Sequence, residues 1–239
     1  MKHSNKTSPD TSIAGAVAII PMLLGTAPFG VIFGAFAVEM GLGHQGGQSM
    51  SLFVFAGSAQ FVGASLYGQG VSLLVVAITT FFINLRHTLY GASLGPKLLS
   101  VSPRQRLLMA FFLTDETFSI VSRFRIVRPR YYWGAALSMY INWQVWTFVG
   151  LISGSYIREV ISVNLAFVMV PAFLAIITSH VNSVSSAFCA LSTMGISVLL
   201  FELPHQLGLM VAGVTAIVLT LLFEKLTSSR SSATNKAKQ

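Results

Sequence analysis

Residues 13–38 read IAGAVAIIPMLLGTAPFGVIFGAFAV and contain no charged side chain. An uninterrupted run of about 18 or more apolar residues is typical of a membrane-spanning helix. Pro21 and Pro28 lie within the run, and an internal proline removes a backbone hydrogen bond and bends or breaks a helix. Such breaks persist in membranes where neighbouring helices or a wet cavity satisfy the freed groups. We therefore predict a membrane helix here and treat it as a candidate broken or re-entrant segment.

The composition of the whole chain agrees with this prediction. Hydrophobic residues make up 54% of the 239 residues and charged residues only 9%, whereas a soluble domain carries about 25% charged residues. The mean hydropathy is +0.73. This composition argues against a soluble enzyme, a disordered chain and a nucleic-acid-binding module. It predicts an all-α, polytopic integral membrane bundle of about seven or eight transmembrane helices, at about 20 residues per span.

Further apolar runs cover residues 49–67, 70–94, 131–156, 160–179, 184–201 and 206–223. Another helix is expected from Pro103, with Ser102 as its cap, to about Ser122. We predict a cytoplasmic N-terminal segment at residues 1–12 and a transmembrane transporter domain at residues 13–223. Residues 224–239 form a basic cytoplasmic tail that we expect to lack regular structure.

The basic residues predict an orientation, with one conflict. The formal net charge is +8, and lysines and arginines between apolar runs mark the cytoplasmic side of a membrane protein. Both termini and the arginine-rich segment 123–130 are therefore predicted to be cytoplasmic. With eight spans the loop at 95–106, which carries Lys97, Arg104 and Arg106, falls outside. Either this loop departs from the rule, or one early segment (13–38 or 49–67) is re-entrant and seven spans remain.

Two acidic residues lie in the helix expected from Pro103. Asp115 is about 18 Å along that helix, and a charge within hydrocarbon costs about 2.5–3.5 kcal/mol. Asp115 and Glu116 are therefore candidates for carrying a coupled proton or binding a cationic group. The alternative is that they only pair with Arg123 near the arginine-rich segment.

The run at 70–94 contains four polar candidates for the same site. Asn84 and His87 share one helix face, and Arg86 and Tyr90 share another. Arg86 could hold a substrate carboxylate or neutralise Asp115 or Glu116. The alternative is that Arg86 extends to the membrane interface while His87 makes a local hydrogen bond.

A small polar patch, Gly57, Ser58 and Gln60, interrupts the run at 49–67. It could bind a zwitterion, or it could only allow close helix packing. Pro21, Pro28 and Pro171 are candidate helix breaks that could allow gating. Trp133, Trp143 and Trp146 suit an interfacial belt.

The sequence contains no HExxH, Walker A or GxSxG motif, and Cys189 is its only cysteine. A membrane enzyme or an ATP-driven pump would need such a group or a nucleotide-binding domain. We therefore expect no enzymatic activity, no metal or other cofactor, and no nucleotide or nucleic acid as a partner.

Three motifs occur in order: AGSAQF at 56–61, RHTLYGASL at 86–94 and LTDETF at 113–118. In this combination the chain resembles the AzlC family, the large subunits of branched-chain amino-acid exporters. The resemblance implies a multi-pass protein of the bacterial inner membrane. It also implies export of leucine, isoleucine, valine and methionine driven by the proton-motive force, together with a small four-helix membrane protein of the AzlD type.

The predicted function is therefore secondary-active export of apolar amino acids. Arg86 and a helix terminus could bind the carboxylate, and Asp115 or Glu116 could bind the ammonium or carry the proton. The alternatives are a non-transporting scaffold subunit, an exporter of another small solute, a membrane enzyme and a passive channel.

Overall fold

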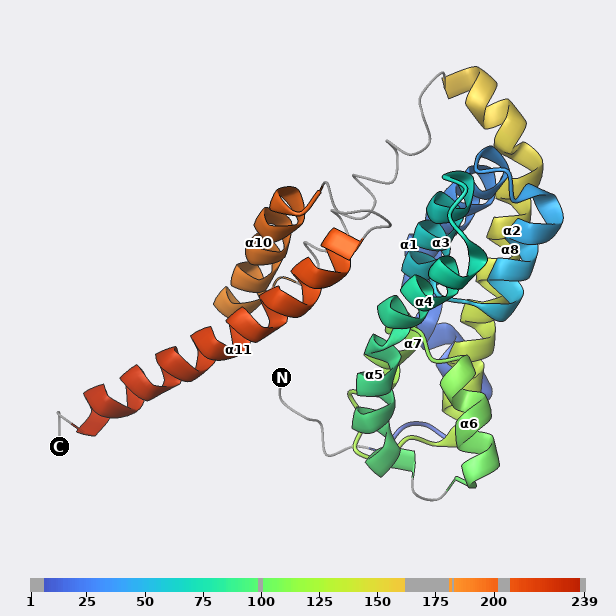
Figure 1. Cartoon of the computed structure of the whole chain (residues 1–239). Coiled ribbons are helices and arrows are strands. Elements are labelled where there is room, and N and C mark those ends of the chain that lie inside the picture. The colour runs from blue at the N-terminus through green and yellow to red at the C-terminus, as the bar shows by residue number, and fades with distance from the viewer. Residues whose placement is uncertain (1–6, 99–100, 162–180, 182, 202–206, 237–239) are drawn as a thin grey trace. The chain divides into compact units, whose positions relative to one another are not determined.

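The computed structural model describes residues 7–98, 101–161, 181, 183–201 and 207–236 (Figure 1). Every regular element within these residues is a helix, and one isolated β-bridge joins Thr7 to Ile126. The all-helical part of the predicted fold class is therefore confirmed. The chain divides into two compact units, residues 1–168 and 169–239. All of the candidate site residues in the described part of the chain lie in the first unit.

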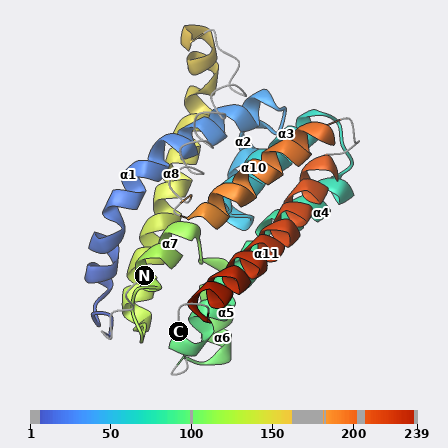
Figure 2. The ribbon, with the colours of Figure 1, turned by 90° about the vertical axis from the view of Figure 1, so that its left-hand side faces the viewer.

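Two long helices, α1 (Ser12–Glu39) and α8 (Pro129–Ile161), form the scaffold of the first unit. They lie side by side in Figure 2, and glycines allow their backbones to approach closely. A Cβ on Gly15 would lie 2.0 Å from the Tyr131 carbonyl oxygen, and one on Gly34 would lie 2.2 Å from that of Thr147. Because residue numbers rise together along the contact, the two helices are parallel.

The helix α1 continues through both of its prolines. The prediction that Pro21 and Pro28 break this run is therefore wrong. Pro28 has no amide hydrogen to donate to the Leu24 carbonyl, yet the helix does not end there. Polar side chains add hydrogen bonds to two other carbonyl groups nearby. The Thr26 hydroxyl donates to the Met22 carbonyl at 3.0 Å, and the Asn142 amide donates to the Leu23 carbonyl at 3.3 Å.

The next two helices, α2 (Gly43–Phe53) and α3 (Gly57–Gly68), form a hairpin. It begins just after Met40, and it also returns to Met40, since a Cβ on Gly68 would lie 2.7 Å from the Met40 sulfur. Both ends of the α2–α3 hairpin therefore lie at the end of the unit where α1 finishes. Of the two early candidates, the run at 49–67 therefore has both ends at one end of the unit, as the re-entrant alternative expects. That it is re-entrant in a membrane stays a prediction.

The chain then returns along α4 (Leu73–Asn84), α5 (Arg86–Leu94) and the 3₁₀ helix η1 (Gly95–Leu98). The helix expected from Pro103 to Ser122 is two helices, α6 (Pro103–Phe111) and α7 (Asp115–Val121). Lys97 contacts both flanks of the loop that follows α7. Its ammonium donates to the Ser122 carbonyl, and its own carbonyl accepts from the Val127 amide at 3.2 Å. The α6–α7 hairpin therefore enters from the end opposite to α2–α3.

This second end of the unit collects the loops that carry positive charge. The loop after η1, the loop after α7 and the N-terminal segment meet here, because Lys97 contacts Val127 and Ser8 accepts a hydrogen bond from the Arg128 amide at 2.8 Å. We call it the basic end; its basic residues are Lys97, Arg104, Arg106, Arg123, Arg125, Arg128 and Arg130. The loops at the Met40 end, residues 40–42 and 69–72, contain no lysine or arginine.

The second unit contains α10 (Val184–Leu199) and α11 (Leu207–Lys236), which pack through Phe188 and Phe223 with ring centroids 4.7 Å apart. Because α11 extends to Lys236, the expectation of an unstructured tail is wrong for residues 225–236. Pro171 lies outside the described residues. In the described part of the chain, Ser12–Glu39 and Leu73–Leu98 are long and apolar enough to cross a membrane. Seven or eight spans remains a prediction.

Candidate functional site

Three interrupted helices meet in the middle of the first unit. The interruptions are Val54–Ala56 between α2 and α3, Leu85 between α4 and α5, and Phe112–Thr114 between α6 and α7. The two hairpin tips converge on Tyr140 of α8, whose ring centroid lies 4.8 Å from that of Phe55 and 5.1 Å from that of Phe112. In transporters, helices broken near the membrane midplane commonly form the substrate and ion sites.

The tip of the α2–α3 hairpin is conformationally strained. Phe55 has a φ of +43°, in the left-handed region that large side chains rarely adopt. The Tyr140 ring packs edge-on against Phe55, and the Tyr140 hydroxyl donates to the Leu52 carbonyl at 3.1 Å. Strain of this kind persists where surrounding contacts fix it and is frequent at functional sites.

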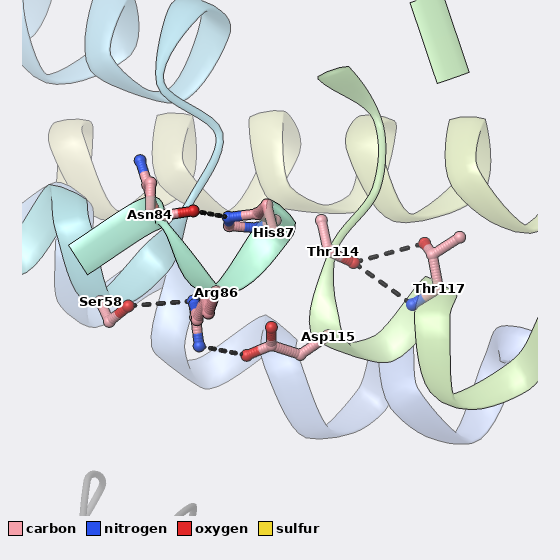
Figure 3. Close-up of polar contacts among 7 residues, drawn as sticks. All are labelled: Ser58, Asn84, Arg86, His87, Thr114, Asp115 and Thr117. Atoms are coloured by element: carbon pink, nitrogen blue, oxygen red, sulfur yellow. Dashed lines mark hydrogen bonds and ion pairs between the residues drawn. The ribbon is translucent and has the colours of Figure 1, made fainter. Parts of the chain in front are cut away.

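Arg86 connects the two hairpins. Its Nη1 donates to Asp115 Oδ2 at 2.5 Å on the α6–α7 hairpin, and its Nη2 donates to Ser58 Oγ at 3.0 Å on the α2–α3 hairpin (Figure 3). The three motifs quoted above therefore each contribute one side chain to a single cluster. We call Ser58, Arg86 and Asp115 the charged cluster.

The charged cluster is incompletely hydrogen-bonded. Arg86 Nε and Asp115 Oδ1 are buried atoms with no hydrogen-bond partner among the described residues. The side chains nevertheless keep 33% and 25% of their surface exposed. A buried polar atom without a partner needs an explanation, and a cationic donor next to an anionic acceptor could take both ends of a zwitterion.

The other candidates on the run at 70–94 lie around this cluster in different directions. Tyr90 interacts with Asp115 and stacks on Phe118, with ring centroids 4.5 Å apart. His87 Nδ1 lies 3.0 Å from the Asn84 carbonyl oxygen, which is the local hydrogen bond considered as its alternative. Asn84 takes part in this contact through its backbone, and its side-chain Oδ1 is buried without a hydrogen-bond partner among the described residues.

Asp115 owes its position to the start of a short helix. Thr114 caps α7 by accepting a hydrogen bond from the Thr117 amide at 3.3 Å, and acidic residues in a first turn are stabilised by the helix dipole. The estimate that Asp115 lies about 18 Å along one helix from Pro103 therefore does not apply. Asp115 pairs with Arg86 rather than with Arg123. Glu116, the next residue, is close enough to interact with both charges of the pair.

Gly57 and Gln60 face α8 instead of Arg86. The Gln60 amide donates to Ser51 Oγ at 2.9 Å, and its oxygen accepts from Trp143 Nε1 at 3.0 Å. Ser51 and Thr147 share a further hydrogen bond of 2.9 Å. We call Ser51, Gln60, Trp143 and Thr147 the Gln60 cluster.

Sequence reasoning missed most of the Gln60 cluster. Trp143, expected at a membrane interface, is 5% exposed, and Thr147 is fully buried. The available signal was their spacing, since residues four apart share a helix face. Gly57 packs on the same tryptophan: a Cβ there would lie 3.2 Å from its ring.

A narrow cavity of about 80 Å³ lies between the charged cluster and the basic end. Its lining runs from Gly91 and Leu113 to Leu98 and Arg106. Ligand pockets usually measure about 300–1,000 Å³, so this cavity is too small to hold an amino acid in the present conformation. Among the described residues, no group of His, Cys, Asp and Glu side chains is arranged to hold a metal ion.

The motifs that build the charged cluster lie within a segment, residues 21–157, that matches the family model described as "AzlC protein". The chain belongs to the AzlC family. This AzlC protein is 26% identical over 226 residues to "Inner membrane protein YgaZ" of Escherichia coli, covering 90% of the chain and 91% of the relative. It is 27% identical over 183 residues to "Branched-chain amino acid transport protein AzlC" of Bacillus subtilis, covering 75% and 71%.

A third relative is an uncharacterised membrane protein of Archaeoglobus fulgidus, 34% identical over 141 residues, covering 59% of the chain and 62% of the relative. No solved structure matches this AzlC protein. The similarity to membrane proteins from several organisms identifies the chain as a membrane protein.

Proposed function

We propose that this chain is the large subunit of a secondary transporter that exports branched-chain and other apolar amino acids. The observation that carries the proposal is the charged cluster, in which Arg86 meets Asp115 where three interrupted helices converge. The name of the Bacillus subtilis relative, a branched-chain amino acid transport protein, supports this substrate class.

The chemistry of the cluster suits a zwitterion. The substrate carboxylate accepts from Arg86, whose Nε donor is free of partners among the described residues, and the ammonium donates to Asp115 Oδ1. The stacked rings of Tyr90 and Phe118 lie next to the pair and offer an apolar surface for an aliphatic side chain. Because the charges are buried in part, a ligand that lacks one of the two charged groups would leave a partner uncompensated.

The charge distribution supports an orientation for this cycle. We propose that the basic end faces the cytoplasm. The loop after α7 at this end carries Arg123, Arg125 and Arg128, whereas the loops 40–42 and 69–72 at the Met40 end carry no lysine or arginine. The N-terminal segment lies at this end through the Thr7–Ile126 bridge. The narrow cavity between Arg106 and Gly91 would then be the cytoplasmic approach to the cluster, and it must widen for loading.

Proton coupling assigns a second role to the acidic pair. Asp115 alternates between its ion pair with Arg86 and a protonated, neutral form. Glu116, the next residue, accepts the proton when Asp115 releases it. A small four-helix partner of the AzlD type completes the complex; the exposed apolar side chains along α4 and α5, among them Leu74, Phe81 and Leu89, are compatible with lipid or such a partner.

The test uses proteoliposomes that contain the full chain, alone and with the AzlD-type partner, loaded with labelled leucine. A pH gradient should drive leucine efflux from liposomes with the unaltered chain. Asp115→Asn should abolish gradient-driven efflux without reducing membrane insertion, whereas Asp10→Asn, at an exposed position, should have no effect.

The alternatives give other results. Efflux at the unaltered rate in Asp115→Asn would remove this residue from the mechanism. Absence of flux with and without the partner would indicate a scaffold subunit, and flux that ignores the gradient would indicate a passive channel.

A further inference from the structure

Three contacts connect α5 and η1 to α7. The helices α5 and α7 begin together at Arg86 and Asp115, and one turn later the Tyr90 and Phe118 rings stack with an interplanar angle of 19°. Beyond the end of α5, the ammonium of Lys97 in η1 donates to the carbonyl of Ser122, the C-terminal cap of α7. Because residue numbers rise together along the contact, the two segments run parallel from the charged cluster to the basic end.

Lys97 contacts the C-terminal end of α7, at the end of the helix opposite to Asp115. Ser122 is the C-terminal cap of α7, and the last carbonyl groups of a helix have no partner within it. A lysine at this point satisfies one of them and interacts favourably with the negative end of the helix dipole. The Lys97 carbonyl also accepts from the Val127 amide at 3.2 Å, so this one residue holds both flanks of the loop.

Because α7 is short, its position, and with it that of Asp115, depends on contacts with other parts of the unit. The helix has seven residues, Asp115–Val121, and isolated helices of that length are unstable in themselves. Its place is set by buried contacts of Thr117, Ile120 and Val121 and by the partners at its two ends. Two turns of helix separate Ser122 from Asp115, so a contact at one end of α7 bears on the position of the group at the other end.

We propose that Lys97 is a positioning residue for the substrate site. It fixes the C-terminal end of α7 and thereby holds Asp115 at the distance from Arg86 that a zwitterion requires. The proposal rests on the proposed function, because Asp115 belongs to the charged cluster that is proposed to bind the amino acid. Lys97 touches neither charge of the cluster, so its effect passes through Asp115.

The experiment measures leucine efflux from proteoliposomes and equilibrium binding of labelled leucine to the purified full-length chain. Lys97→Met, which keeps the length of the side chain and removes the ammonium, should raise the KM and Kd for leucine about five- to twentyfold. The maximal rate should change less. Lys97→Arg should restore both constants to within about twofold, because a guanidinium can also donate to the Ser122 carbonyl. The matched control, Arg104→Met, removes an exposed charge from the same end and should leave them unchanged.

A double variant separates positioning from general stabilisation. In an Asp115→Asn background, Lys97→Met should not weaken leucine binding further, since the group it positions is already neutral. An equal loss in both backgrounds, or an unchanged KM in Lys97→Met, would overturn the proposal. If Lys97→Met is not recovered folded, Lys97→Gln should raise KM about two- to fivefold, and an unchanged value again overturns it. Absence of leucine binding by the unaltered chain would instead refute the proposed function and this inference with it.

Discussion

The two polar clusters of the first unit are neighbours on α3, yet they differ in the completeness of their hydrogen bonding. In the Gln60 cluster, Ser51, Gln60 and Thr147 are fully buried, and both polar ends of Gln60 are bonded. In the charged cluster, Arg86 and Asp115 remain a third and a quarter exposed, and each retains an unpartnered atom. A fully bonded network rigidifies a fold, whereas buried polar atoms without partners need an explanation, which a bound ligand would supply in the proposed function.

The comparison also separates residues that are adjacent in the sequence. Gly57 and Gln60 face Trp143 on α8, while Ser58, between them, faces Arg86. One turn of α3 therefore carries a structural face that anchors the hairpin to the scaffold and a second face that reaches the candidate site. Four substitutions can break or sharpen this division.

The largest effect should come from Arg86→Gln. Loss of a charge that is paired in the protein costs about 2–5 kcal/mol, which lowers kcat/KM for leucine efflux by about 30-fold or more. The measurement is efflux from proteoliposomes at matched protein content. Arg104→Gln is the control for removing a basic side chain, and transport by Arg86→Gln at the control's rate would contradict the assignment of the charged cluster.

An intermediate effect, on stability alone, is expected from Gln60→Leu. The leucine leaves the buried Trp143 Nε1 without its acceptor and Ser51 Oγ with Thr147 as its remaining partner, which should lower the free energy of unfolding by about 1–3 kcal/mol. Thermal unfolding in detergent measures the loss as a lower Tm. Gln69→Leu, at the exposed end of the same helix, should leave the Tm unchanged.

Activity gives the second half of that comparison. Leucine efflux per folded molecule of Gln60→Leu should match that of the unaltered chain. A large rise in KM at unchanged Tm would instead place Gln60 in the substrate path.

The smallest effect is expected from the neighbouring pair Ser58→Ala and Gly57→Ala. Ser58→Ala removes one hydrogen bond to Arg86 and should raise the KM for leucine about three- to tenfold at unchanged Tm. Gly57→Ala should lower the Tm and leave the KM for leucine unchanged. Its Cβ would lie 3.2 Å from the Trp143 ring and so disturb the packing of the Gln60 cluster. Both quantities are measured for both variants, and equal effects of the two substitutions would remove the distinction between the faces of α3.

Much of the fold could be predicted from the pattern of apolar runs. The limits of α1 lie within one residue of the predicted run, and Ser102 caps the helix at Pro103 as its sequence indicates. The charge pattern also led to a re-entrant segment as one of two explanations for the basic loop at 95–106, and that explanation stays a prediction. The pattern could not choose between the two candidate runs, because both were apolar and both contained residues that interrupt helices.

The candidate site was only partly accessible to the same reasoning. Polar residues in apolar runs are costly, and this drew attention to Ser58, Arg86 and Asp115. The Gln60 cluster escaped notice because its members are uncharged. Two of its hydrogen bonds also join residues far apart in the chain: Gln60 to Trp143 over 83 positions and Ser51 to Thr147 over 96.

By itself the sequence determined an all-helical membrane protein, because backbone groups in an apolar environment must be hydrogen-bonded within their own helix. The tertiary structure decided where those helices are interrupted. None of the interruptions at Val54–Ala56, Leu85 and Phe112–Thr114 contains a glycine or a proline, whereas Pro21 and Pro28 lie inside a continuous helix. Differences in helix propensity amount to less than about 1 kcal/mol for ordinary residues. Packing of the hairpin tips on Tyr140 and the pairing of Arg86 with Asp115 can outweigh such differences, and both depend on residues far apart in the chain.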